Sequence, residues 1–412
     1  MKLGIVRETQ TPPDRRVPLI PSQCRMLLDR YPDLEILVQH SDSRCFTDKD
    51  YEVQGIPLAE DLSSCEVLLG VRGVATEAMI PGKTYLFFSH TAKKQPYNRS
   101  LLQAIISKKI RFIDYELLTG EDRVRVVALG RWAGVVGAYN ALRAYGLRYN
   151  EYVLRPASKC KDLVELKWEL GNVELGPVRF AVTGGGRAAG GSVEMLDAAG
   201  IRQVAPHTYL QQSFDTAVYT RLDPWHYTRR KYGTPFNFAH FLSRPGMYEN
   251  TFLPYAARTD VLIASHYWDP RAPMILTRED LCRKDIKIAV IADVSCDIKG
   301  PIQSTIRASS FADPFYGYDP ETGYETEPFE RDSVTVMAVD CLPGALPRDA
   351  STDFGGALME HVIPELLGIK KTGMLERACI VSDGTLTSNF AYLQDYLDEK
   401  GRSAWPGHIY NT

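Results

Sequence analysis

The chain has 412 residues, of which 44% are hydrophobic and 24% are charged, and its formal net charge is -3 at pH 7. This length exceeds what one hydrophobic core usually serves, so we expect two domains. The nearly balanced charge excludes a positive field that would attract nucleic acid or an anionic membrane. No uncharged apolar run reaches the roughly 18 residues of a membrane span, and the N-terminal MKLGIVRETQ lacks the apolar core of a signal peptide. We therefore expect a soluble, cytoplasmic protein without nucleic-acid or membrane partners.

The eight cysteines are scattered, with no C-x-x-C pair and no nearby histidine at the spacing of a zinc site. In a chain of this length without an export signal, a disulfide framework is not expected. We interpret most of these cysteines as small buried thiols and predict no metal site.

Residues 1 to about 130 alternate short apolar runs with helical patterns. The expected strands are KLGIV, EILVQH, CEVLLGV, TYLFFSH and RFIDYELL, and the expected helices are SQCRMLLDRY and NRSLLQAIISKK. Such alternation predicts a parallel sheet covered by helices. The next segment, WAGVVGAYNALRAYGL, is apolar at helical spacing, and its small residues Ala133, Gly134 and Gly137 favour close packing. We interpret it as a long helix that leaves the first domain.

The segment VRFAVTGGGRAAGG, residues 178–191, is the most informative motif of the chain. An apolar strand pattern ends there in clustered glycines and continues directly into a helical pattern. Gly184, Gly186 and Ala189 occupy the three small positions of a dinucleotide-binding turn, which serve the tight turn, the approach of the pyrophosphate and close helix–strand packing. Amide groups at the helix start, beside Arg187, would face the phosphates. We predict a site for NAD or NADP.

The alternating pattern resumes in TDVLIASHYWD, the helical LTREDLCRKD, KIAVIADVSCD and VTVMAVDCL. These segments predict a second doubly wound sheet, so the fold class is α/β with two Rossmann-like domains. Residues 205–255 lack a clean period and are either an insertion over one face or a contact in a homo-oligomer. The acidic DPFYGYDPETGYETEPFERD, with its glycines and prolines, is interpreted as a surface loop.

The C-terminal part predicts further regular structure. STDFGGALMEHVIPELLG has a helical pattern, ACIVSDG a strand pattern, and NFAYLQDYLDEKG an amphipathic helical pattern. These elements either cap the second domain or return to the first.

Polar residues of the first half lie at strand ends or in tight turns, where open α/β sheets expose side chains to ligands. Arg16 follows the turn TPPDR, and Arg72 ends CEVLLGVR. His90 ends TYLFFSH, and Glu116 lies in RFIDYELL. Arginine can bind a substrate carboxylate with two hydrogen bonds, histidine can exchange protons near neutral pH, and a carboxylate can orient the imidazole. The alternative is that these are ordinary surface or salt-bridge residues.

Two polar residues also end strands in the second half: His266 in IASHYWD and Asp340 in VTVMAVDCL. We expect His266 to pack near the nicotinamide, and Asp340 either to hydrogen-bond near it or to cap the next turn. NAD-specific sites usually carry an acid at the end of the second strand, but this chain reads VAPH at 204–207. Arg187 or Arg202 could favour a 2′-phosphate, so the choice between NAD and NADP stays open.

Several motifs place these residues in a known context: DRRVPLIP, LLGVR, KTYLFFSHTAKKQ, RFIDYELL, RVRVVALGRWAGVVG, GPVRFAVTGGG, ILTREDL, ADVSCD, VDCLPGALPRDAS and SDGTLTSN. In them the chain resembles the lysine-ketoglutarate reductase (lysine-forming saccharopine dehydrogenase) family, within the wider alanine dehydrogenase and transhydrogenase group. The resemblance implies two Rossmann-like domains with a substrate cleft between them, the first completed by the C-terminal part. On this basis residues 1–132 with 343–412 form the substrate domain, and residues 133–342 form the NAD(P)-binding domain.

The resemblance also implies roles for single residues. Arg16 and Arg125 would bind a substrate carboxylate, His90 would act as acid and base, and Glu116 would be its acidic neighbour. Gly184, Gly186 and Ala189 would take the pyrophosphate, and Asp340 would lie by the cofactor.

One position departs from the family, which places a catalytic lysine where this chain has Arg72. Arginine does not release a proton near neutral pH, so proton transfer would fall on His90 or on Lys93. Arg72 would then anchor a carboxylate or stabilise negative charge on oxygen. Either the amine substrate differs from lysine, or the chemistry tolerates a fixed cation, or the site has lost turnover.

The activity that the resemblance implies is NAD(P)H-dependent reduction of an imine. The imine would form from an amino acid, lysine or a similar one, and a 2-oxo acid such as 2-oxoglutarate. One alternative is an amino-acid dehydrogenase like alanine dehydrogenase, with ammonia in place of the second amine. The other is a non-catalytic NAD(P)-binding regulatory protein, which the loss of the site lysine allows.

Overall fold

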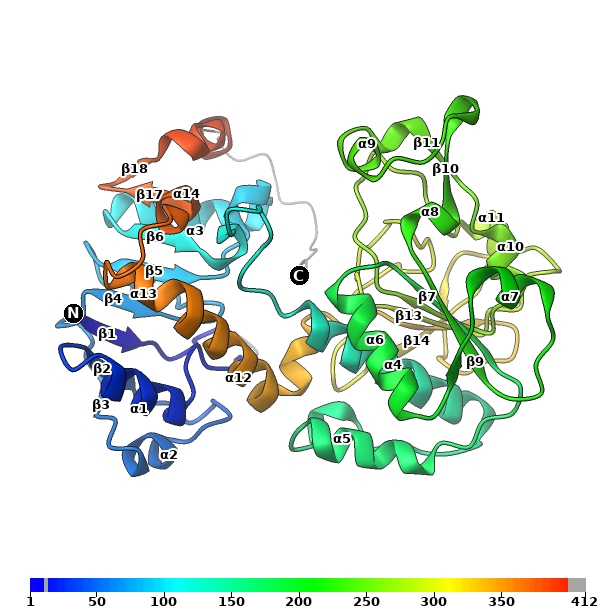
Figure 1. Cartoon of the computed structure of the whole chain (residues 1–412), viewed down its shortest axis with the longest axis horizontal. Coiled ribbons are helices and arrows are strands. Elements are labelled where there is room, and N and C mark those ends of the chain that lie inside the picture. The colour runs from blue at the N-terminus through cyan, green and yellow to red at the C-terminus, as the bar shows by residue number, and fades with distance from the viewer. Residues whose placement is uncertain (11–13, 399–412) are drawn as a thin grey trace. The chain divides into compact units, whose positions relative to one another are not determined.

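The computed structural model describes residues 1–10 and 14–398, and its two sheets fall into two compact units. Among the described residues, unit 1 contains 1–129 and 347–398, and unit 2 contains Gly130–Leu346. Each unit is a mostly parallel sheet with helices on its faces, as Figure 1 shows. The predicted α/β class with two doubly wound units is confirmed.

Unit 1 is built on an eight-stranded sheet of order β18-β17-β6-β5-β4-β1-β2-β3. The strands from β3 to β6 are mutually parallel, whereas β17 runs antiparallel to β6 and β18 antiparallel to β17. The strands are β1 (Lys2–Ile5), β2 (Glu35–Gln39), β3 (Leu58–Ala59), β4 (Val67–Leu69), β5 (Thr84–Phe87), β6 (Arg111–Asp114), β17 (Cys379–Ser382) and β18 (Thr385–Leu386).

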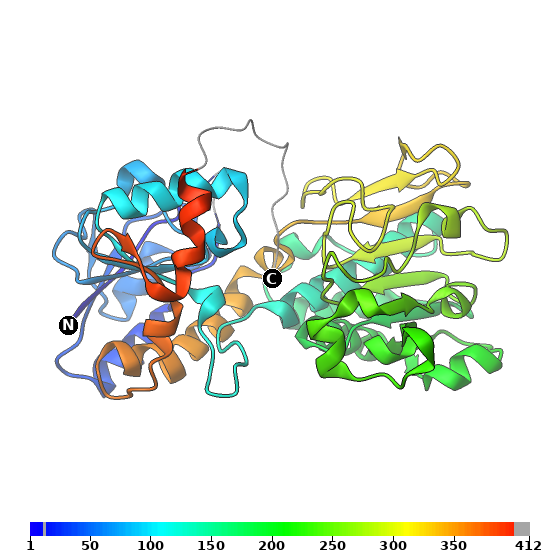
Figure 2. The ribbon, with the colours of Figure 1, turned by 90° about the horizontal axis from the view of Figure 1, so that it is seen from above.

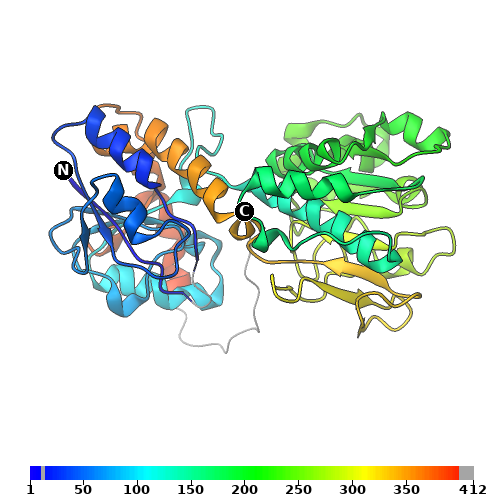
Figure 3. The same ribbon diagram turned by 90° about the horizontal axis from the view of Figure 1, so that it is seen from below.

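The C-terminal elements return to unit 1, which is one of the two placements that the sequence left open. Strand β17 extends the sheet beyond β6, and helix α12 packs beside α1, where the Gln23 amide donates to the Thr352 carbonyl at 2.8 Å (Figure 3). A π-helical turn, Leu358–Val362, joins α12 to α13. The helices of unit 1 are α1 (Pro21–Arg30), α2 (Asp48–Val53), α3 (Arg99–Ser107), α12 (Pro347–Ala357), α13 (Ile363–Leu366), α14 (Met374–Ala378) and α15 (Gln394–Asp398).

Unit 2 has a second eight-stranded sheet, of order β15-β14-β16-β13-β12-β7-β9-β8. The run from β8 to β16 is parallel, and the hairpin β14–β15 is added antiparallel at one edge, as the gold strands in Figure 2 show. The strands are β7 (Arg179–Thr183), β8 (Arg202–Gln203), β9 (Val218–Leu222), β12 (Val261–Ala264), β13 (Val290–Asp293), β14 (Phe315–Tyr318), β15 (Glu325–Thr326) and β16 (Val334–Met337), with a separate ribbon of β10 (Thr228–Arg230) and β11 (Tyr248–Asn250).

The helices of unit 2 cover both faces of this sheet. They are α4 (Gly130–Tyr149), α5 (Leu163–Glu169), α6 (Arg187–Ala198), α7 (Pro206–Gln211), α8 (Pro224–Tyr227), α9 (Phe238–Ser243), α10 (Leu253–Ala256) and α11 (Arg278–Leu281). Single 3₁₀ turns occur in both units, at Thr76–Ala78, Thr91–Lys93, Pro96–Asn98, Tyr115–Leu117, Ala157–Lys159, Leu170–Asn172, Lys231–Gly233, Pro245–Met247, Leu342–Ala345 and Ser388–Leu393.

Two segments of unit 2 differ from the sequence-based expectation. The stretch 205–255 is not only irregular, because it contains β9, which pairs directly with β7 at the centre of the sheet. The acidic stretch 313–332 is not a plain surface loop, because it contains the hairpin β14–β15. Tyr316 and Tyr318 of β14 are buried in the hydrophobic core of unit 2, which explains why this polar stretch forms a strand.

Helix α4 is the long helix expected from its small residues, and it packs on α6 at very short range. A Cβ at Gly134 would lie 1.8 Å from the Ala188 carbonyl oxygen, and one at Gly191 would lie 2.0 Å from the Arg131 carbonyl oxygen. Only glycine allows two helix backbones to approach this closely. The contact holds α6, which follows the glycine turn, against the sheet.

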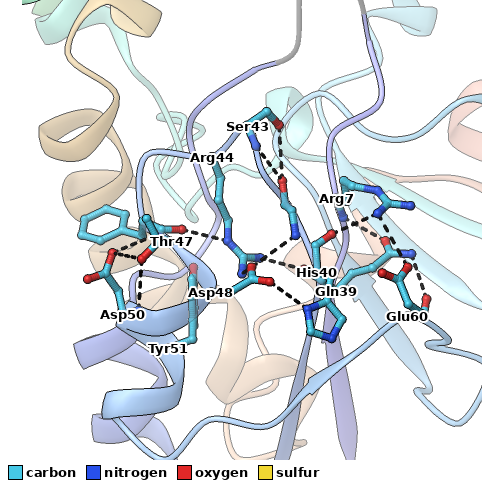
Figure 4. A network of polar contacts seen from close by, with 12 residues as sticks. Arg7, Gln39, His40, Ser43, Arg44, Thr47, Asp48, Asp50, Tyr51 and Glu60 are labelled. Carbon is cyan, nitrogen blue, oxygen red and sulfur yellow. Dashed lines mark hydrogen bonds and ion pairs between the residues drawn. The ribbon is translucent and has the colours of Figure 1, made fainter.

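A polar network orders the loop that follows β2 (Figure 4). The buried Arg44 guanidinium binds the Asp48 carboxylate and the carbonyls of Phe46 and Gln39, and it lies over the Tyr51 ring. This loop in turn fixes the N-terminal segment, because the Cys45 N–H donates to the Arg15 carbonyl at 2.7 Å. The network therefore positions the backbone beside Arg16.

Within the described residues, no helix is long and apolar enough to cross a membrane. The described part of the chain also holds no group of three or more histidine, cysteine or acidic side chains that could bind a metal ion. Of the eight cysteines, Cys282 is exposed, Cys341 is half-buried and the other six are buried, as expected for small core thiols.

Candidate functional site

Glu116 is the centre of a charged cluster in unit 1. Its Oε2 lies 2.9 Å from His90 Nδ1, and its Oε1 lies 2.8 Å from Lys93 Nζ and 3.0 Å from Arg125 Nη2. Burial by itself would raise the pKa of Glu116, but the hydrogen bond from His90 and the charge of Lys93 hold that pKa well below its usual range. Because an ionised carboxylate only accepts hydrogen bonds, His90 Nδ1 donates, and the ring presents Nε2 on its other side.

The sheet explains why these residues meet. His90 follows β5 and Glu116 follows β6, and these neighbouring parallel strands end at the same edge. Below them, the rings of Phe88, Tyr115 and Phe354 pack with centroid separations of 5.0 to 5.9 Å. A cluster of buried aromatic rings therefore packs next to the charged groups, with the Phe88 ring stacked on that of His90 at a centroid separation of 6.3 Å.

A second charged group of unit 1 surrounds Asp14. Its carboxylate binds Arg16 through two contacts, at 2.9 Å to Nε and 2.5 Å to Nη2, and both side chains are almost fully buried. Burial raises the pKa of Asp14, but the charges of Arg16 and Arg72 outweigh this effect and lower it below its usual range. Two of the donors of Arg16 are therefore directed at a carboxylate of the protein itself.

The backbone around Arg72 is held by three consecutive residues that follow β1. The Glu8 carboxylate accepts from the N–H groups of Val71 (2.6 Å) and Arg72 (3.1 Å), and the Gln10 amide donates to the Arg72 carbonyl at 2.8 Å. The Thr9 hydroxyl accepts from the Ala75 N–H at 2.7 Å. The loop that carries Arg72 is fixed by side chains that the sequence analysis did not single out.

In unit 2, the glycine turn has the geometry that a dinucleotide requires. Gly184 has φ +109°, and a Cβ there would lie 2.6 Å from the Ser265 carbonyl oxygen, so only glycine fits. A Cβ at Gly186 would meet nothing within 4 Å, which leaves open space over the start of α6. Ala189 is fully buried and Arg187 is exposed. The residues present therefore fit a pyrophosphate at this helix start.

The structure corrects the interpretation of the ribose position. Strand β8, which precedes VAPH, is the edge strand, and the strand beside β7 is β9. Strand β9 ends at Leu222 and is followed by Asp223, whose Oδ1 would lie 2.1 Å from a Cβ at Gly185. The acid expected at the second strand is therefore present. It comes late in the sequence because β8 and α7 are inserted before β9.

Asp223 was missed by the sequence analysis, although a local signal exists. In VYTRLDP the apolar run is short and is interrupted by Thr220 and Arg221, so it lacks a clear strand pattern. The Asp-Pro pair that follows is typical of a helix start, and Asp223 does cap α8. Arg221 lies 3.5 Å from the Asp223 carboxylate.

The remaining predicted residues of unit 2 lie at strand ends, as expected from the sequence. His266 Nδ1 lies 2.7 Å from the Thr183 hydroxyl, and burial lowers the pKa of this histidine to about 4, which keeps the ring neutral. Asp340 follows β16, and its N–H donates to the Ser309 carbonyl at 3.4 Å.

A pocket partly open to solvent lies in unit 2 between α8, α9 and the loop after β12. Tyr227, four residues after Asp223, lines it together with Phe241, Leu242, Tyr267, Trp268 and Ile275. The Tyr227 ring also packs against His266, at a centroid separation of 6.2 Å. The pocket therefore adjoins the residues around the glycine turn.

Of the predicted site residues in unit 1, the structure thus brings four together in one cluster: His90, Lys93, Glu116 and Arg125. Arg16 and Arg72 face Asp14 instead. In unit 2, Gly184, Gly186 and Ala189 lie at the glycine turn, and the backbone of His266, which follows β12, adjoins Gly184. The roles of all these residues stay predictions.

Comparison with known proteins gives a consistent result. The model of the alanine dehydrogenase/PNT N-terminal domain matches residues 4–136. Alpha-aminoadipic semialdehyde synthase of Arabidopsis thaliana is 29% identical over 445 residues, which cover 95% of this chain and 41% of that protein. The chain therefore spans less than half the length of this relative.

A shorter relative matches along nearly its whole length. The saccharopine dehydrogenase [NAD(+), L-lysine-forming] of Emericella nidulans is 24% identical, covering 90% of this chain and 92% of that protein. Among solved structures, an L-alanine dehydrogenase superposes with a TM-score of 0.64 at 16% identity and covers 96% of this chain and 99% of that chain, which establishes a shared fold. The chain is thus similar in sequence to saccharopine dehydrogenases and alpha-aminoadipic semialdehyde synthases, its residues 4–136 match the alanine dehydrogenase/PNT N-terminal domain, and it shares the fold of an L-alanine dehydrogenase.

Proposed function

We propose that this protein is an NAD(P)-dependent oxidoreductase of the saccharopine dehydrogenase type. It reduces the imine formed by an amino acid, lysine or a similar one, and a 2-oxo acid such as 2-oxoglutarate. The observation that carries the proposal is the imidazole of His90 held by Glu116 where the neighbouring parallel strands β5 and β6 end. The dinucleotide turn of unit 2 and the names of the relatives support it.

The chemistry needs proton transfer at defined atoms. The amine adds to the keto carbon, and His90 Nε2 protonates the carbinolamine oxygen so that water leaves and the C=N bond forms. Gly184, Gly186 and Ala189 would hold the dinucleotide, whose reduced nicotinamide would supply the hydride that this carbon accepts. The product is a secondary amine, and Glu116 stabilises the charged and neutral imidazole in one orientation throughout.

The fixed cations have a complementary role. Arg72 and Arg125 attract the carboxylates of the two substrates, and the Glu116 carboxylate offsets part of the positive charge of Lys93 and Arg125. Substrate binding at Arg16 requires its guanidinium to accommodate a carboxylate in addition to Asp14. Lys93, whose Nζ lies 2.8 Å from Glu116 Oε1, would bind the oxo acid.

The decisive test replaces His90 by alanine. We expect His90→Ala to lower turnover by about a hundred- to ten-thousand-fold, because general acid catalysis is lost, while NADH affinity changes little. His361→Ala is a control, since His361 Nε2 also lies near a carboxylate of unit 1, that of Glu360 at 3.7 Å, outside the proposed site. Unchanged turnover in His90→Ala would remove His90 from the mechanism.

A substrate panel separates the alternative functions. NAD(P)H oxidation is measured with 2-oxoglutarate and with pyruvate, each against lysine, ornithine, arginine and ammonia. Dependence on ammonia would favour an alanine dehydrogenase-like enzyme. Cofactor binding without oxidation across the panel would favour a regulatory protein, and activity gained in Arg72→Lys would then show that the site lysine had been lost.

For the cofactor, we propose NAD rather than NADP. Asp223 follows β9 and can accept hydrogen bonds from both ribose hydroxyls, and its charge would repel a 2′-phosphate. We expect Asp223→Asn, which keeps a capping residue at the start of α8, to raise the Kd for NADH about tenfold or more. The ratio of the Kd for NADPH to that for NADH should fall. Tighter binding of NADPH than of NADH by the unaltered protein would refute this choice.

A further inference from the structure

Asp114 is a buried carboxylate that the proposed mechanism does not use. It is the last residue of β6, lies opposite Phe87 of β5 in the sheet, and is fully buried. An ionisable side chain at such a position requires specific partners, because desolvation penalises its charge.

One carboxylate oxygen of Asp114 accepts a hydrogen bond from Glu116, and the other accepts hydrogen bonds from Ser89, which precedes His90. Oδ1 accepts from the Glu116 backbone N–H at 2.9 Å. Oδ2 accepts from the Ser89 N–H at 3.1 Å and from the Ser89 hydroxyl at 2.6 Å. One carboxylate thus ties together the two strand ends from which the imidazole and its partner project.

The Ser89 side chain links Asp114 to Thr91, so the residues before and after His90 are both hydrogen-bonded. The Ser89 hydroxyl, which donates to Asp114, accepts from the Thr91 N–H at 3.2 Å and lies 2.8 Å from the Thr91 hydroxyl. His90 itself has φ +55°, a left-handed conformation that costs about 1 kcal/mol or more for a residue with a Cβ. Such a conformation persists only where surrounding bonds enforce it.

We propose that Asp114 is a positioning residue that acts through His90, by holding the imidazole in reach of Glu116. This inference rests on the proposed function, in which His90 carries the proton. Misplacement of a reacting group by about 1 Å can lower a rate about a hundredfold. Loss of the hydrogen bonds from Asp114 to Ser89 and Glu116 should therefore lower kcat. The amide of asparagine keeps the bond to the Glu116 N–H but cannot accept from Ser89 with its nitrogen.

The test combines Asp114→Asn with His90→Ala. We expect Asp114→Asn to lower kcat about tenfold to a hundredfold with NADH affinity within about twofold, and to lower kcat no further in the His90→Ala background. Glu365→Gln is the matched control, because Glu365 is also a buried carboxylate of unit 1 that accepts from backbone N–H groups, those of Met374 and Leu375. It should lose stability without this loss of kcat.

Two outcomes would overturn the inference: kcat of Asp114→Asn within twofold of the unaltered protein, or an equal loss of kcat with and without His90. If Asp114→Asn does not fold, Ser89→Ala removes the hydroxyl of the same chain of bonds and should give a smaller loss of kcat. Unchanged kcat in a folded Ser89→Ala would then count against the inference.

A readout without turnover keeps this inference distinct from the proposed function. Nitrogen NMR of the His90 ring, assigned with His90→Ala, should show the proton on Nδ1 in the unaltered protein and a mixture of tautomers in Asp114→Asn. If no substrate pair is turned over, the proposed function fails, and the ring tautomer still tests the positioning. Identical ring signals in the two proteins would refute it.

Discussion

Two buried glutamates of unit 1 show how the neighbours of a carboxylate set its charge. Glu116 is surrounded by three cationic or protonatable groups, so its pKa lies well below the usual range. Glu8 has no such partners, and burial together with the charge of Asp14 raises its pKa to about 8, against the opposing backbone N–H groups of Val71 and Arg72. The two residues should therefore respond to pH in opposite senses.

For Glu116, ionisation stabilises the folded protein. Its folded pKa is below the unfolded value of about 4.5, so the contribution is present above pH 4.5 and is lost as the pH falls further. We expect Glu116→Gln to lower the free energy of unfolding by about 3 kcal/mol at pH 7 and by less at pH 4, as measured by urea unfolding. Glu35→Gln, which breaks the exposed pair with Lys2, should have little effect. An equal loss at both pH values would contradict this account.

For Glu8, the protonated form stabilises the folded protein. The folded pKa of about 8 lies above the unfolded value of 4.5, so this stability is complete below pH 4.5 and is lost as the pH rises to 8. Between pH 5 and 8 the unfolding free energy of the unaltered protein should fall relative to Glu8→Gln, with a slope of at most about 1.4 kcal/mol per pH unit. Parallel pH profiles for the two proteins would show that Glu8 stays ionised.

At the scale of elements, the contact of α4 with α6 supports the glycine turn. The sequence predicted a closely packed helix from Ala133, Gly134 and Gly137, and α4 has this property. The backbone contact itself depends on two glycines from different segments, Gly134 and Gly191. Small residues in one helix indicate that another element packs closely against it, but only the folded structure shows that this element is α6.

A pair of glycine substitutions tests this contact. Gly134→Ala places a Cβ 1.8 Å from a backbone oxygen, so the helices must separate, and we expect a loss of about 2 kcal/mol or more in unfolding free energy. Gly190→Ala on α6 meets no atom within 4 Å and should stabilise by up to about 1 kcal/mol through helix propensity. Thermal unfolding of both variants provides the comparison. A stable Gly134→Ala would mean that α4 and α6 adapt at little cost.

The central strands of unit 1 were predictable because their sequences are apolar runs, whereas two strands of unit 2, β9 and β14, lack such runs. Strands such as β4 and β5 are buried on both faces and are encoded as unbroken apolar runs, VLL and TYLF, bounded by turn residues. Strand β9 is equally central, yet Thr220 and Arg221 interrupt its pattern. Strand β14 is FYGY within an acidic stretch, and its buried tyrosines are recognisable only from the core that they fill.

At the scale of the whole molecule, unit 1 is assembled from two distant parts of the chain. Residues 347–398 contribute α12 and the pair β17–β18, and β17 covers the edge of β6. Unit 2 is continuous over 130–346. The two units should therefore differ in their ability to fold when they are separated.

We expect residues 130–346 expressed alone to unfold cooperatively on heating. Residues 1–129 alone should not, because the β6 edge is left unpaired and the rings of Phe88 and Tyr115 lose their contact with Phe354 of α12. Circular dichroism during thermal unfolding measures both, with the full chain as the control. A cooperative transition of residues 1–129 would show that the C-terminal segment is dispensable for the fold.

Local patterns were enough to predict the α/β class, the glycine turn and the position of His90 beside Glu116, because strand ends of a parallel sheet converge wherever the apolar runs are clear. The order of the strands in space is not encoded in their order along the chain. For that reason the acid Asp223 beside the glycine turn and the bridge from Asp114 to Ser89 emerged from the folded structure alone. Each depends on a contact between segments whose separation in the sequence carries no periodic signal.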